Sequence, residues 1–196
     1  MKLWDELFEL TGETVKLLPM ELEHISDLWE AAKPEEIWEF TSGIVTSIEE
    51  CSNMVESAIA DREKGISYPF VIREIESNRI VGSTRFLDIS PFHKSVEIGW
   101  TWYHPSVWRT RVNTECKFLL LEHAFEKWNL NRVQLKTDAR NVRSQKAIER
   151  IGGVKEGILR QDRVIHNGFI RDTVFYSFLK EEWPQVREQL LSKLDK

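Results

Sequence analysis

The sequence has few of the residues that build metal sites and disulfide frameworks. Only two of its 196 residues are cysteines, Cys51 and Cys116, and they lie far apart in the chain. The five histidines show no spacing typical of metal ligands. We therefore expect no disulfide and no metal site, and we expect both cysteines to be reduced thiols in the core.

Long apolar runs and strong positive charge are also missing. No apolar run approaches the ~20 residues that a membrane-spanning helix needs, and the acidic first residues lack the apolar segment of a secretion signal. The net charge of −5 argues against a dedicated nucleic-acid binder and mildly favours cationic substrates such as amines. These absences predict a cytoplasmic protein with neither a membrane nor a nucleic-acid partner.

Three common catalytic signatures are absent as well. The chain has no Gly-x-Ser-x-Gly turn of a serine hydrolase, no Gly-Lys-Ser/Thr phosphate loop, and no three-glycine dinucleotide fingerprint after a strand. Hydrolase, kinase and dehydrogenase functions therefore lack support.

The residues that are present describe one globular domain. Apolar residues make up 41% of the chain and charged residues 30%, and no repeat or linker divides residues 1–196. Periodicity predicts helices over 21–33, 48–64, 116–128, 141–151 and 182–193, the last a polar surface helix. It predicts strands over 12–20, 67–74, 79–89, 96–102, 132–138, 157–166 and 169–179. Because helix 116–128 joins two parallel strands, this order predicts an α+β domain with a central mixed, mostly antiparallel sheet flanked by helices.

A basic loop lies between the strand at 96–102 and the helix at 116–128. The loop contains Trp108, Arg109, Thr110, Arg111, Val112, Asn113 and Thr114. A helix entered from such a loop presents unpaired N–H groups and the positive end of its dipole. We interpret this loop as an anion site, most simply for phosphates.

The helix after the strand at 132–138 is marked at both ends. Asn141 is a good N-cap, and Gly152-Gly153 supplies a left-handed stop. Because parallel strands end at the same edge of a sheet, Asn141 should lie beside the basic loop.

These stretches, in this order, resemble the GNAT N-acetyltransferase superfamily, in the branch of the ribosomal-protein alanine acetyltransferases (RimJ/RimL-like). The resemblance covers nearly the whole chain and implies a GNAT-like acyl-CoA N-acyltransferase fold that uses acetyl-CoA and no metal. It places the pyrophosphate of coenzyme A on the loop and Asn141 near the thiol end. In most relatives, glycines stand at the positions of Arg109 and Arg111, and alanine at that of Asn113. Side chains there restrict close backbone approach, although two guanidiniums suit phosphate oxygens.

The resemblance also implies direct transfer of an acetyl group to a primary amine. Ser144 matches the serine that protonates the leaving thiolate, because Ile148 replaces the tyrosine of many other members; alternatively, Ser144 only bonds the helix backbone. A backbone N–H near Trp102 would hold the oxyanion. Alternation places Glu97 on the strand face opposite Val96, Ile98, Trp100 and Trp102. Glu97 is either the general base or the partner of a lysine or arginine across the sheet.

The acceptor side is less defined. The resemblance places the first helices along the acceptor pocket, so Trp38 and Phe40 either line it or pack in the core. The acceptor is either a protein N-terminus or a small-molecule amine, and a homodimer is left open. A rival hypothesis is a catalytically inactive acyl-CoA-binding sensor or interaction module, which the substituted loop glycines favour. Release of free thiol in the presence of amines distinguishes the two.

Overall fold

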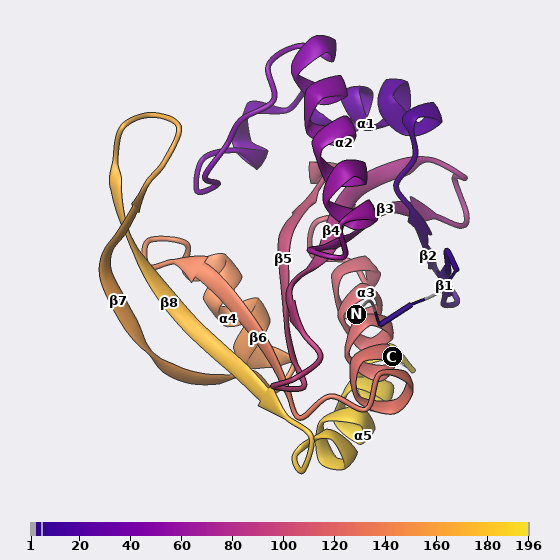
Figure 1. Cartoon of the computed structure of the whole chain (residues 1–196), viewed down its shortest axis with the longest axis vertical. Helices are drawn as coiled ribbons and strands as arrows, with labels where there is room; N and C mark the ends of the chain where they lie inside the picture. The colour runs from indigo at the N-terminus through magenta and orange to yellow at the C-terminus, as the bar shows by residue number, and fades with distance from the viewer. Residues whose placement is uncertain (1–2, 5, 196) are drawn as a thin grey trace.

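A single sheet with helices on both faces forms the framework of the protein. The computed structural model describes residues 3–4 and 6–195, and its eight strands follow the order β1-β2-β3-β4-β5-β6-β8-β7 (Figure 1). The strands are β1 (Leu10–Thr11), β2 (Val15–Pro19), β3 (Tyr68–Glu74), β4 (Ile80–Ser90), β5 (Ser95–Tyr103), β6 (Arg132–Asp138), β7 (Val154–Val164) and β8 (Ile170–Leu179). The helices are α1 (Ile25–Ala32), α2 (Ile48–Glu63), α3 (Val112–Glu122), α4 (Val142–Arg150) and α5 (Trp183–Leu194). The predicted α+β class is confirmed.

One pair of neighbouring strands is parallel, and it separates soon after it forms. β5 and β6 are in register at Ser95↔Arg132, Val96↔Val133 and Glu97↔Gln134. Beyond these pairs the two strands diverge, although β5 continues to Tyr103 and β6 to Asp138 (Figure 1). The predicted parallel pair is confirmed, and we call the wedge between the diverging strands the β5–β6 opening.

Two apolar clusters cover the two faces of the sheet. Val96, Ile98 and Leu135 point to the face covered by α3 and α5, where Leu120 and Leu190 are fully buried. Val71 and Trp102 point to the opposite face and pack with Leu28 of α1 and Val55 of α2. The sheet therefore separates an α3 side from an α1–α2 side.

The helix after the basic loop begins earlier than predicted. α3 starts at Val112 rather than Cys116, because the buried Val112 side chain already belongs to the apolar face and Glu115 N–H donates to the carbonyl of Arg111 at 2.9 Å. A π-helical turn over His123–Lys127 carries it to the predicted end. Four residues assigned to the loop thus form the first turn of a helix.

The last helix is not the polar surface helix that was predicted. Trp183, Val186 and Leu190 of α5 are buried, and the Trp183 ring lies 5.5 Å from that of Phe125. The prediction missed this apolar face because charged residues stand between the apolar ones in the sequence. The strand β7 also differs from the prediction, because it begins at Val154, three residues before the predicted start at Gly157.

Both cysteines are free and buried, as predicted. Burial raises the pKa of Cys51 to about 11 and that of Cys116 to about 12, so neither is a reactive thiolate at neutral pH. Among the described residues, no cluster of His, Cys, Asp or Glu is arranged to hold a metal ion. No described helix combines the length and apolar character needed to cross a membrane.

Candidate active site

The start of α3 lies where β5 ends, and local hydrogen bonds fix the loop between them. The Trp108 indole donates to the carbonyl of Tyr103 at 2.8 Å, and the Thr110 hydroxyl donates to the carbonyl of Val107 at 2.7 Å. No described side chain caps α3. The Val112 N–H donates to the Thr110 hydroxyl at 3.3 Å, which leaves the next N–H groups of the first turn, those of Asn113 and Thr114, to face an anion. The anion site itself stays a prediction.

The two arginines at the expected glycine positions differ in backbone conformation. Arg109 has φ of 63°, in the left-handed region that favours glycine, whereas Arg111 has φ of −66°. Only the first position thus needs the conformational freedom of glycine. Arg109 is exposed, and Arg111 places a terminal nitrogen 3.3 Å from the Glu13 carboxylate.

A buried carboxylate anchors the first turn of α3 to the N-terminal strands. Glu115 accepts hydrogen bonds from the N–H groups of Glu13, Thr14 and Val15 at 2.8, 2.8 and 3.0 Å. It also accepts one from the Thr14 hydroxyl at 2.5 Å. The turn between β1 and β2 therefore holds the helix that carries the candidate anion site.

Helix α4 runs along the loop and the first turn of α3, with its start near Trp108 and its last residue at Thr114. Asn141 caps α4 by accepting a hydrogen bond from the Ser144 N–H at 2.9 Å, which confirms the predicted N-cap. The Arg143 guanidinium lies 3.8 Å from the Trp108 ring centre, and Arg150 donates to the Thr114 hydroxyl at 2.7 Å. The Ser144 hydroxyl forms no hydrogen bond with the residues that the structure describes, so the backbone-bonding alternative is not seen.

A β-bulge in β5 changes which side chains share a face. Trp100 has φ of 48°, and the register with β4 shifts between the pairs Arg85↔Gly99 and Ser83↔Trp102. The bulge turns Trp102 to the α1–α2 side, while Val96 and Ile98 remain on the α3 side. The expectation that Trp102 faces away from Glu97 is therefore wrong, because it assumed an unbroken alternation.

Beyond the bulge, β5 offers unpaired backbone groups to the opening. The Trp102 carbonyl faces β4 so closely that a Cβ at Gly82 would lie 2.2 Å from its oxygen, and His104 N–H donates to Val81 on the same strand. Because backbone groups alternate along a strand, the N–H of Tyr103 points the other way, into the β5–β6 opening. A donor next to Trp102 therefore faces the opening.

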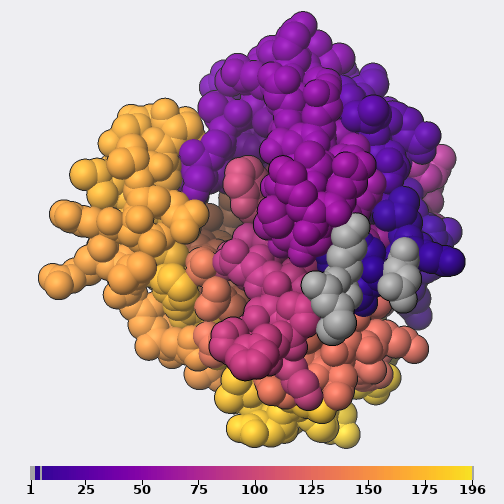
Figure 2. All heavy atoms as spheres, in the orientation of Figure 1, coloured from indigo at the N-terminus to yellow at the C-terminus, as the bar shows by residue number. Residues whose placement is uncertain are grey.

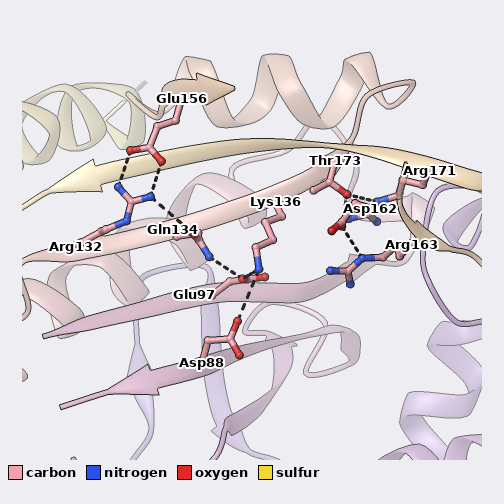
Figure 3. A network of polar contacts seen from close by, with 10 residues as sticks. All are labelled: Asp88, Glu97, Arg132, Gln134, Lys136, Glu156, Asp162, Arg163, Arg171 and Thr173. Atoms are coloured by element: carbon pink, nitrogen blue, oxygen red, sulfur yellow. Dashed lines mark hydrogen bonds and ion pairs between the residues drawn. The ribbon is translucent and has the colours of Figure 1, made fainter. Parts of the chain in front are cut away.

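Glu97 is held by partners from β6. Its carboxylate lies 2.5 Å from the Lys136 ammonium and accepts a hydrogen bond from the Gln134 amide at 3.0 Å (Figure 3). Lys136 also lies 3.7 Å from Asp88 of β4. The cross-sheet pairing alternative for Glu97 is thus present, at the last residue pair before the opening, and its role as a base stays a prediction.

The predicted acceptor residues have different surroundings. Trp38 is buried, donates its indole N–H to the Ala32 carbonyl at 2.9 Å and packs 5.4 Å from Trp102. Phe40 is half-buried and lies 5.5 Å from the Arg140 guanidinium, which stacks 3.6 Å from Phe169 of the β7–β8 hairpin.

The tip of the β7–β8 hairpin closes one end of a hollow on the α1–α2 side. His166 in the tip lies 3.0 Å from the Trp38 carbonyl. Figure 2 shows the surface hollowed between this hairpin and the layer that contains α2. The contacts of His166 with Trp38, and of Phe169 with Arg140 beside Phe40, join this hairpin to residues 38–40, and a role of Trp38 and Phe40 in an acceptor pocket stays a prediction.

Several polar residues of this region were not singled out from the sequence. Arg132, Gln134, Lys136 and Asp138 alternate along β6, a pattern that already predicted a polar face but named no partner. No sequence pattern indicated a role for Lys117. It is buried in α3 and donates to the Thr101 hydroxyl at 2.8 Å, and burial lowers its pKa to about 8.

Comparison with known sequences agrees with this geometry. Residues 14–154 match the family described as acetyltransferase (GNAT) domain. YdaF of Bacillus subtilis (strain 168), named as a candidate ribosomal N-acetyltransferase, is 33% identical over 104 residues, which are 53% of this chain and 56% of YdaF. The match thus spans little more than half the length of that relative.

Solved structures share the architecture over nearly the whole chain. A protein from T. thermophilus, described as a candidate acetyltransferase, is 34% identical with a TM-score of 0.86, covering 97% of this chain and 99% of that one. RimJ of Mycobacterium smegmatis, in complex with CoA-disulfide, has a TM-score of 0.82 over 98% of this chain and 97% of its own. RimJ is 20% identical, so this similarity concerns the fold alone.

Proposed function

The chain belongs to the GNAT acetyltransferase family, and from this premise we propose that it transfers an acetyl group from acetyl-CoA to a primary amine. The acceptor is a protein N-terminus, as the name of YdaF suggests, or a small-molecule amine. The observation that carries the proposal is the position of the uncapped α3 start at the end of the β5–β6 opening.

The described residues fit acetyl-CoA, which supplies the acetyl thioester when it is bound. The α3 N–H groups, with Arg109 and Arg111, suit its phosphates. The unpaired edge of β5 offers backbone donors and acceptors to an extended chain. Asn141 and Ser144 at the start of α4 would lie along its thiol end, and no metal is needed.

Three groups would act on the reacting atoms. The Ser144 hydroxyl would donate a proton to the leaving sulfur and regain one from solvent, and a backbone N–H of β5 next to Trp102 would stabilise the charge on the carbonyl oxygen. Glu97 accepts the proton of the attacking amine, directly or through water. For this step the Lys136 ammonium must share the carboxylate with the acceptor.

Dependence on the acceptor tests the role of Glu97. A terminal α-amino group has a pKa near ~8 and a lysine near ~10.4, so a lysine-like amine needs more help from a base. Glu97→Gln should therefore reduce kcat/KM more for a lysine-like amine than for an α-amine. Equal losses for both amines, or none, would remove Glu97 from proton transfer.

Thiol release tests the function itself. The protein is incubated with acetyl-CoA and a panel of peptides and small amines, free thiol is measured, and products are identified by mass spectrometry. Acetylated product above the background without protein supports the proposal. Tight acetyl-CoA binding by calorimetry, with no thiol release for any amine, would instead identify an acyl-CoA sensor.

A further inference from the structure

Among the residues that the structure describes, one buried arginine on the α1–α2 side of the sheet has neither a hydrogen bond nor an ion pair. Three of the described arginines are buried: Arg62, Arg85 and Arg171. Arg62 donates to the Met20 carbonyl at 2.8 Å and to the Glu21 carboxylate at 2.7 Å. The Nε of Arg171 donates to the Thr173 hydroxyl at 2.9 Å. Arg85 is 7% exposed, and among the described residues its Nε has no hydrogen-bond partner and its guanidinium forms no ion pair.

Arg85 lies on the same face as the proposed acceptor groups. Its neighbours Thr84 and Phe86 point to the α3 side, where Thr84 bonds Thr101 and Phe86 joins the core. Alternation therefore turns Arg85 to the α1–α2 side, the face of Glu97. It is in register with Gly99 of β5, two residues along the strand from Glu97.

The guanidinium makes a cation–π contact with an aromatic ring. The Trp100 ring centre lies 4.8 Å from it, and Trp100 is 56% exposed at the edge of the β5–β6 opening. A ring compensates a buried charge only in part. Burial accordingly lowers the pKa of Arg85 to about 10, and Asp61 of α2 offsets this from a distance.

Such an arginine weakens the fold unless an anion arrives. A buried charge without a partner is costly, because the charge loses its hydration and no protein group compensates for it. A guanidinium presents N–H groups in a planar fork that matches a carboxylate. Arg85 thus has the properties of a ligand-binding group more than those of a structural one.

We infer that Arg85, flanked by Trp100, binds a carboxylate of the acceptor, so that the preferred acceptor is an amine carrying a carboxylate near its amino group. This inference rests on the proposed acetyltransferase function. Gly99 and Glu97 are two residues apart along β5, or ~7 Å. That spacing suits either the α-carboxylate of a small amino acid or an acidic side chain next to a peptide N-terminus.

Matched acceptors separate these two sources. Ala-Glu-Ala amide is compared with Ala-Gln-Ala amide for the side-chain carboxylate, and alanine with alaninamide for the α-carboxylate. For each acceptor, kcat/KM of wild type is divided by that of Arg85→Gln, which cancels differences in amine pKa. We expect a ratio of about 10 to 100 for the charged member of one pair, as for a charge-assisted hydrogen bond, and about 1 for its amide. The KM for acetyl-CoA should not change.

A matched control and a second measurement make the result decisive. Arg163→Gln removes an exposed guanidinium of β7 that pairs with Asp162, and it should leave all ratios near ~1. Calorimetry with CoA present measures the affinity for the N-acetylated form of each acceptor. The four products are those of Ala-Glu-Ala amide, Ala-Gln-Ala amide, alanine and alaninamide. Wild type should bind one charged product more tightly than its amide, and Arg85→Gln should lose this preference without a lower melting temperature.

Two outcomes separate failure here from failure of the proposed function. If no amine is acetylated, the proposed function fails, and the calorimetric preference still decides whether Arg85 binds a carboxylate. If wild type and Arg85→Gln show the same preference in both measurements, the inference is overturned. A marked fall in melting temperature with unchanged preference would make Arg85 a structural residue.

Discussion

Replacing Glu115 by glutamine should destabilise the protein more than its single-atom change suggests. One carboxylate oxygen accepts the Glu13 N–H, and the other accepts the N–H groups of Thr14 and Val15 and the Thr14 hydroxyl. A glutamine amide nitrogen in place of the first oxygen would face the Glu13 N–H, donor against donor. The remaining bonds would also lose the charge of the acceptor.

The expected cost follows from these bonds. Leaving the partly buried Glu13 N–H without a partner costs at most the ~1–3 kcal/mol of a fully buried one, and hydrogen bonds to a charged group contribute more than neutral ones. We expect Glu115→Gln to lower the free energy of unfolding by about 2–3 kcal/mol. That is a large share of the ~5–15 kcal/mol typical of a domain.

Urea unfolding with an unchanged m-value measures this loss. Glu122→Gln is the matched control on the same helix, because its partly exposed carboxylate lies 3.6 Å from Arg187 and should contribute less than ~1 kcal/mol. Acetyl-CoA affinity should fall with Glu115→Gln, since the anchored turn carries the proposed phosphate site. A change below ~0.5 kcal/mol would show that the hydrogen bonds to Glu115 do not hold α3 in place.

Four further changes have definite expected outcomes. Arg109→Gly should raise the free energy of unfolding by up to ~1 kcal/mol, because a φ of 63° strains a residue that has a side chain. The same change should weaken acetyl-CoA binding at low salt, and tighter binding in calorimetry would contradict a phosphate contact. Asn141→Asp keeps the cap but loses an amide donor, so an unchanged KM for acetyl-CoA would leave Asn141 only its capping role. Ser144→Ala should lower kcat about tenfold to a thousandfold at an unchanged melting temperature, and full turnover would end its catalytic role. Arg132 lowers the pKa of Glu156 from 4.5 to about 2, so this pair stabilises the fold above pH ~4.5 and stops doing so as the pH falls toward 2. The difference in melting temperature between wild type and Glu156→Gln should shrink over that range, and a constant difference would exclude this linkage.

Local patterns predicted the parts of the fold that depend on neighbours in sequence. The parallel pair, the loop before α3 and the Asn141 cap follow from periodicity and end signals within about fifteen residues. The start of α3 was missed because Val112 and Glu115 join the helix through contacts with the core and with β1–β2.

The bulge and the ion pairs depend on residues far apart in the chain. The positive φ of Trp100 inverts the alternation of β5, and nothing in the sequence around it marks the bulge except Gly99. From the sequence, Glu97 could form an ion pair with any of several basic residues. The β5–β6 register and the face on which Lys136 lies select Lys136 as the partner. The Phe40–Arg140–Phe169 contact joins three segments that no local pattern connects.

The short parallel pairing has a consequence for local opening of the sheet. Three residue pairs join the β1–β5 part of the sheet to the β6–β8 part. Beyond Glu97, the amide hydrogens of β5 that face the β5–β6 opening should therefore exchange with solvent faster than those bonded to β4. An extended ligand in the β5–β6 opening would bond to that edge as an added strand would. The amide of Tyr103 would then change from one of the fastest-exchanging of the strand to a protected one, and the two parts of the sheet would resist opening together.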